Sequence, residues 1–217
     1  GNMTSGGTES IFLAVKTARD WAKSNRPRVK LPEIVAPRTA HPAFNKAAHY
    51  LGMKVIRVPE AFNFRANVQA MSAAITQNTV LIVGSAPTWP HGVFDPITGL
   101  GQLAIDNGLL FHVDSCVGGF LAPFVKKLGY PIPQFDFSVP GVTSISADLH
   151  KYGFCPKGAS TILYRNPEIY GHQWFDFNEW PRGQYTGPAF TGSRTGGAIA
   201  AAWAVMNYLG QDGYLKL

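Results

Sequence analysis

Apolar residues recur at helical spacing near the start of the chain. Ile11, Val15, Ala18 and Ala22 follow one another at intervals of three or four positions. This periodicity places the apolar side chains on one face of a helix. It predicts a helix over residues 8–24.

Short runs rich in β-branched residues follow, and further helical patterns separate several of them. The run VLIV at 80–83 is apolar at consecutive positions, which is typical of a strand covered on both faces of a sheet. The predicted strands cover residues 33–37, 54–59, 79–87, 109–116, 144–148 and 160–165. The predicted helices cover residues 42–51, 66–76, 97–107 and 196–209. The alternation predicts an α/β domain with a mostly parallel sheet flanked by helices. The stretch 165–197, rich in Gly, Pro and aromatic residues, is expected to be an ordered loop.

Composition narrows the class of protein. With 46% hydrophobic and 15% charged residues among 217, the chain has ample material for a buried core. The net charge of +6 is not gathered in a long basic block, so we expect no nucleic-acid binding and only a mild preference for anionic substrates. Two cysteines, Cys116 and Cys155, argue against a disulfide framework and are compatible with a reducing compartment. No apolar run is long enough for a membrane span, and no signal-peptide pattern is present.

Four segments with candidate binding or catalytic residues fall at predicted strand ends or helix starts, where ligands of open α/β sheets bind. TSGGT at 4–8 precedes the first helix, and its glycines and free N–H groups suit an anion; a simple helix cap explains it equally well. FTGSRTGG at 190–197 is a second such loop. Asp114 ends a strand in HVDSC and would hold a protonated ring nitrogen, or cap a turn.

Lys151, in ADLHKYG, follows the next predicted strand. A lysine amine attacks carbonyls when its surroundings depress its pKa or fix its approach, although a solvated strand-end lysine is the commoner case. Asp114 and Lys151 are 37 positions apart (151 − 114), which leaves room for one crossover and one strand. We therefore expect the two side chains at neighbouring strand ends.

The order of these segments is more specific than any one of them. Along the chain they run as a Gly-rich helix start, a histidine loop, a strand-end Asp, a strand-end His-Lys pair and a Gly-Ser-Arg loop. This order resembles the fold type I pyridoxal-phosphate enzymes and, within them, the sphingosine-1-phosphate lyase family. The resemblance covers the whole chain and depends on TSGGTES, AHPAFNKAAHYLGMKVIRVP, PHGVFDP, HVDSCVGGF, GVTSISADLHKYGFCPKGAS and GSRTGG. It implies that residues 1–217 form the cofactor-binding large domain of such an enzyme. We expect a piece of a longer protein, without its N-terminal segment and C-terminal small domain.

The resemblance implies a role for each candidate around the pyridoxal ring. Lys151 would bind the cofactor aldehyde, and Asp114 would pair with the pyridine nitrogen. His41 would stack on one face of the ring, and Cys116 would pack under the other as a small soft residue. Asp148 and His150 would line the approach to Lys151, with His150 touching the phosphate or the ring.

The phosphate ligands follow from the same resemblance. Ser5, Gly6, Gly7 and Thr8 would hold the cofactor phosphate at the helix start. Gly192 and Ser193 would reach the phosphate of a partner subunit's cofactor, because such sites form at a homodimer interface. Ser85 and His91 would border the cofactor, His112 would be a core or helix-facing residue, and no metal is expected.

The implied reaction is cleavage of the C2–C3 bond of a phosphorylated sphingoid base by a retro-aldol path, giving a fatty aldehyde and phosphoethanolamine. Lys151 or a histidine would shuttle the protons, and the sequence does not choose between them. Two alternatives remain open: an amino-acid decarboxylase of the glutamate or aromatic type, and a non-catalytic remnant of the fold. The expected location is cytoplasmic, or membrane-associated if a missing N-terminus carries an anchor.

Overall fold

Seven strands form one mostly parallel sheet in the computed structural model, which describes residues 1–217. In sheet order they are β1 (Asn2–Thr4), β7 (Ser160–Tyr164), β6 (Ser144–Ala147), β5 (Leu110–Asp114), β4 (Thr79–Ser85), β2 (Glu33–Pro37) and β3 (Lys54–Val58). The five strands from β6 to β3 are parallel to their neighbours. At the β6 end of this run, β7 pairs antiparallel with β6, and β1 pairs antiparallel with β7. The predicted α/β class and mostly parallel sheet are confirmed.

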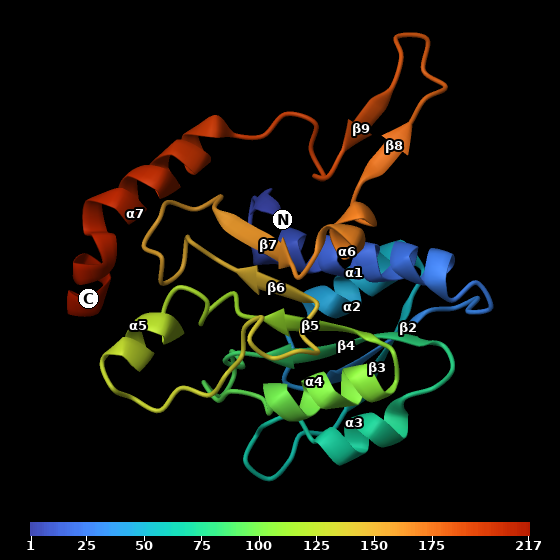
Figure 1. Ribbon diagram of the computed structural model, residues 1–217, viewed down its shortest axis with the longest axis horizontal. Coiled ribbons are helices and arrows are strands. Elements are labelled where there is room, and N and C mark those ends of the chain that lie inside the picture. Colours follow the sequence, from blue (N-terminus) through green and yellow to red (C-terminus); the bar gives the residue numbers. More distant parts are fainter.

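Helices cover both faces of this sheet (Figure 1). One face carries α1 (Gly7–Asn25) and α2 (Ala43–Leu51); the other carries α3 (Val68–Ala74) and α4 (Ile97–Asp106). Within β4, Leu81 packs on the α1–α2 side and the next residue, Ile82, on the α3–α4 side. Consecutive apolar residues in the central strands therefore bury both faces, as their sequence pattern predicts.

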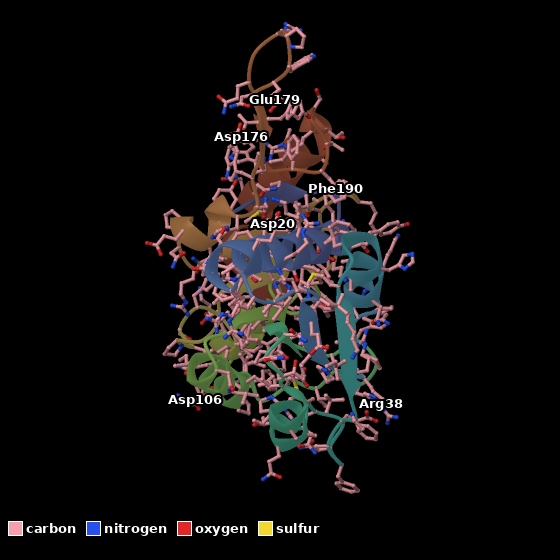
Figure 2. The ribbon with its side chains drawn as sticks, turned by 90° about the vertical axis from the view of Figure 1, so that its right-hand side faces the viewer. Asp20, Arg38, Asp106, Asp176, Glu179 and Phe190 are labelled. Atoms are coloured by element: carbon pink, nitrogen blue, oxygen red, sulfur yellow. The ribbon has the colours of Figure 1, made fainter.

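The remaining elements lie outside these two pairs of helices. They are α5 (Ala122–Lys127), α6 (Pro167–Gly171), β8 (Phe175–Phe177), β9 (Tyr185–Gly187) and α7 (Gly196–Lys216). The β8–β9 hairpin stands out from the body, with Asp176 and Glu179 in its outer part (Figures 1 and 2). The stretch 165–197 was expected to be an ordered loop; the assignment as loop is wrong, because α6 and the hairpin lie there. None of the helices combines the length and the apolar character that crossing a membrane requires.

Candidate active site

The carboxyl ends of β5 and β6 meet the first turn of α1 around one cavity of about 500 Å³. These two strands are parallel neighbours, with Asp114 paired in register with Ser146. Asp114 and Lys151, far apart in sequence, both line the cavity, as expected from their strand-end positions. The other predicted site residues that line it are Ser5, Gly6, Gly7, Thr8, His41, Ser85, Cys116, Asp148 and His150.

Lys151 is held by an ion pair. Its Nζ lies 3.0 Å from Oδ2 of Asp148, and a third of the lysine side chain is exposed. Burial lowers the pKa of Lys151, but the acidic groups around the amine, Asp148 first among them, together outweigh burial, so the net pKa is raised above its ordinary value. The amine is therefore protonated in this state, and of the two routes to reactivity the structure supports a fixed approach over a depressed pKa.

Asp148 is buried beneath the start of α1, with 1% of its side chain exposed. Its Oδ1 has no hydrogen-bond partner, and its Oδ2 also lies 3.4 Å from Nε2 of His150. A methyl group at Gly7 would lie 2.9 Å and 3.1 Å from the two carboxylate oxygens, so only glycine permits this approach. The positive end of the α1 dipole favours a carboxylate at this place.

Both histidines at the cavity have one ring nitrogen committed to the backbone. Nδ1 of His150 accepts hydrogen bonds from the N–H groups of Gly158 and Ala159, at 3.2 Å and 3.3 Å. Nδ1 of His41 accepts from the N–H of Ala43 at 3.1 Å. Each neutral ring therefore carries its proton on Nε2. Burial also lowers the pKa of His150, against the opposing charge of Asp148, which favours this neutral form.

Asp114 presents one carboxylate oxygen to the cavity. Its Oδ1 accepts from the Cys116 N–H at 3.1 Å and from the Ser146 hydroxyl at 3.2 Å, whereas Oδ2 has no hydrogen bond within the chain. Only 8% of the residue is exposed. Buried carboxylates are stable when each oxygen is satisfied, so Oδ2 is suited to a cationic N–H donor from a ligand.

Cys116 lies between the two carboxylates of the site. Burial, and then the charges of Asp114 and Asp148, raise the pKa of its thiol well above the ordinary value. The thiol is therefore neutral, and it donates a hydrogen bond to Oγ of Ser146. This agrees with the interpretation of Cys116 as a packing residue rather than a nucleophile.

The first turn of α1 forms the anion cradle. Ser5 uses its N–H and its hydroxyl to bind Oε2 of Glu9, at 2.7 Å and 2.6 Å. A methyl group at Gly6 would lie 3.4 Å from Cε1 of His150, which leaves that glycine open to a ligand on the cavity side. The N–H groups at this end have the polarity that a phosphate needs.

Some candidates lie elsewhere. Ser193 lines a second hollow together with Ser5 and Glu9, and Gly192 lines a third beside the hairpin; neither reaches the main cavity. Their proposed reach to a partner's phosphate stays a prediction. His91 does not line the cavity either. Its ring stacks on that of Phe64, with 4.4 Å between the ring centroids.

Three contributors were missed from the sequence. Glu9 and Trp89 line the cavity, and Ser146 supports Asp114 from behind. Glu9 lies four positions after Ser5, whereas a capping box needs a spacing of three, so the sequence did not mark this pair. Ser146 gave no signal either, because a serine inside a short strand has no pattern of its own.

The chain is similar to known proteins along its whole length. A family model described as the pyridoxal-dependent decarboxylase conserved domain matches residues 1–216. Sphingosine-1-phosphate lyase of Arabidopsis thaliana is 56% identical over all of this chain and 40% of its own length; sphingosine-1-phosphate lyase 1 of Rattus norvegicus is 51% identical over 38% of its length. The chain thus spans about 40% of such relatives.

Solved structures show the same arrangement of elements. Sphingosine-1-phosphate lyase of Burkholderia pseudomallei superposes with a TM-score of 0.95 at 44% identity, covering 99% of this chain and 49% of that one. Glutamate decarboxylase of Lactobacillus brevis superposes with a TM-score of 0.83 at 23% identity, covering 99% of this chain and 51% of that one, which is a likeness of fold alone.

Proposed function

Because the chain belongs to the pyridoxal-dependent decarboxylase family, we propose that it forms the cofactor-binding part of a carbon–carbon lyase. The substrate proposed is a phosphorylated long-chain base, and the bond cleaved is C2–C3. The observation that carries the proposal is the shared cavity, which Asp114, Lys151 and the α1 cradle all line. The choice of a lyase over a decarboxylase is supported by relatives at 43–56% identity that are sphingosine-1-phosphate lyases.

The residues present fit pyridoxal phosphate. Gly6 leaves open the space that a side chain would fill at the cradle, Gly7 lets α1 approach Asp148 and Cys116, and Oδ2 of Asp114 has no hydrogen-bond donor within the chain. Lys151 supplies the amine that the cofactor aldehyde requires. A phosphate at the cradle would compete with the Glu9 carboxylate for the N–H and hydroxyl of Ser5.

When bound, the cofactor supplies an electron sink for the pair left on C2 after the bond breaks. Asp114 would hold the protonated ring nitrogen through Oδ2, and Lys151 would hold the cofactor aldehyde and supply an amine beside the substrate. His41 and His150 both keep their Nδ1 lone pairs in backbone hydrogen bonds, so neither is free to accept a proton there. We therefore assign to Lys151 the transfer of the proton taken from the C3 hydroxyl and the proton delivered to C2.

Two copies are proposed to share their sites, with Gly192 and Ser193 of each reaching the cofactor phosphate of the other. The exposure of both residues supports this arrangement. The wild-type protein is expected to lose cofactor as the dimer is diluted. This dependence on concentration is expected to be smaller in Ser193→Ala. Equal cofactor retention by isolated monomers would contradict it.

The test of the reaction is product analysis with the full-length protein. Loaded with pyridoxal phosphate, it is expected to convert a phosphorylated sphingoid base to a fatty aldehyde and phosphoethanolamine, while Lys151→Ala forms neither. Glutamate and aromatic amino acids serve as the second substrate set. Release of carbon dioxide from that set without aldehyde from the first would identify a decarboxylase instead, and no product from either would favour a non-catalytic scaffold.

A further inference from the structure

A line of hydrogen bonds runs behind Asp114 through the β5–β6 pair. The Ser144 hydroxyl lies 2.8 Å from Nδ1 of His112, and Nε2 of the same ring lies 3.1 Å from Oγ of Ser146. Oγ of Ser146 lies 3.2 Å from Oδ1 of Asp114. His112 and Ser146 are fully buried and Ser144 nearly so, so water does not compete for these bonds.

The direction of each bond follows from the carboxylate at its end. Asp114 as a carboxylate only accepts, so the Ser146 hydroxyl donates to it. The Ser146 oxygen is then left to accept from Nε2–H of His112, and Nδ1 of that ring accepts from Ser144. A neutral ring is required, and burial lowers the pKa of His112 to about 4 despite the nearby Asp114 charge.

A purely structural role for His112 does not account for this arrangement. Its neighbours in β5, Phe111 and Val113, fill the α3–α4 side of the sheet with apolar side chains, and His112 faces the other side against Phe44. An apolar residue would pack there without the cost of burying two ring nitrogens. The polar ring is satisfied only because two serines were placed on β6 to meet it.

We propose that His112 and Ser146 are positioning residues, which hold Oδ1 of Asp114 so that Oδ2 faces the ring nitrogen of the bound cofactor. The inference rests on the proposed cofactor site and assigns the orientation of its key carboxylate to two residues that do not reach the cavity. Without the Ser146 hydroxyl, Oδ1 keeps a single donor, the Cys116 N–H, and the carboxylate is free to turn.

The experiment uses the full-length protein loaded with pyridoxal phosphate labelled with ¹⁵N at the ring nitrogen. The ¹⁵N chemical shift reports directly how far that nitrogen is protonated, and a titration gives the cofactor Kd. Ser146→Ala removes the donor to Asp114, and His112→Phe removes the donor to Ser146. His112→Gln keeps a donor near the Nε2 position, and Ser160→Ala removes a buried hydroxyl that bonds Ser10 on the far side of β6.

We expect Ser146→Ala to shift the ring nitrogen toward its unprotonated signal and to weaken cofactor binding about tenfold, as loss of a bond to a charged group does. His112→Phe should do the same, His112→Gln should recover most of the wild-type signal, and Ser160→Ala should match the wild type. If His112→Phe does not fold, Ser146→Ala decides alone.

Two failures are distinguishable. A wild-type signal and Kd in Ser146→Ala, with cofactor still attached to Lys151, overturns the positioning role and leaves the proposed function standing. A wild-type protein in which borohydride reduction attaches no cofactor to Lys151 overturns the proposed function, and the inference with it.

Discussion

Replacing Gly7 by alanine tests how closely the start of α1 must approach the reactive end of the cavity. The added methyl group would lie 2.7 Å from Sγ of Cys116 and 2.9 Å from Oδ2 of Asp148. Both distances are shorter than carbon makes with either atom in packed proteins, so the helix or the two side chains must move. Asp148 carries the ion pair to Lys151, and any shift of the carboxylate therefore reaches the amine.

The size of the effect is set by two opposing contributions. Overpacking a tight site costs about 1–3 kcal/mol, whereas alanine is favoured over glycine in a helix by roughly 1 kcal/mol. We expect a net loss of about 1 kcal/mol in the free energy of unfolding. Cofactor affinity should fall further, about tenfold, because the change also disturbs a charged hydrogen bond at Lys151.

Gly99→Ala is the matched control. Gly99 also lies in the first turn of a helix, α4, but a methyl group there would meet only Cγ2 of Val68, at an ordinary 3.5 Å. Urea denaturation and cofactor titration should show Gly99→Ala at least as stable as the wild type, with an unchanged Kd. Adding Cys116→Ala to Gly7→Ala should recover part of the lost stability. Equal stability and equal Kd in Gly7→Ala and Gly99→Ala would refute the packing argument.

Further predictions concern pH and thiol chemistry. Burial raises the pKa of Asp95 to about 6, although hydrogen bonds from the Ala66 and Ser85 N–H groups oppose the shift. Between pH 4 and 6 the folded state therefore binds a proton that the unfolded state has lost, and the stability that this group contributes falls as the pH rises. Asp95→Asn should remove that fall, which is up to about 3 kcal/mol, in denaturation at pH 4 and pH 7. His112 acts oppositely: its pKa of about 4 is below that of the unfolded chain, so stability is lost as pH falls from 6.5 toward 4, and His112→Gln should abolish this loss. Cys116 should react with iodoacetamide at pH 8 more slowly than free cysteine, because burial raises its pKa; mass spectrometry showing rapid labelling would contradict the assigned burial.

Much of the fold follows from local pattern. The predicted helix over 8–24 appears as Gly7–Asn25, because its apolar face is long and regular. The β8–β9 hairpin was missed because its strands are short and mostly exposed, so no alternation of buried and exposed residues marks them. α5 was missed for a similar reason, since six residues with a proline in the first turn leave too little periodicity to detect.

The site was predictable as far as it depends on residue type at strand ends. Asp114 and Lys151 meet because β5 and β6 are parallel neighbours, which the chain length between them allows. The backbone hydrogen bonds to Nδ1 of His41 and of His150 depend on loop geometry, which residue spacing does not predict. Ser146 likewise became visible only once β6 was placed beside β5.

The central claim is that Lys151 carries the cofactor while Asp114 faces it from the next strand. Borohydride reduction of the cofactor-loaded full-length protein, followed by peptide mapping, tests this most directly. We predict a single pyridoxyl group on Lys151, with labelling abolished by Lys151→Ala and strongly reduced by Asp114→Ala. A pyridoxyl group on Lys46 or Lys157 instead, or undiminished labelling after Asp114→Ala, would contradict the account.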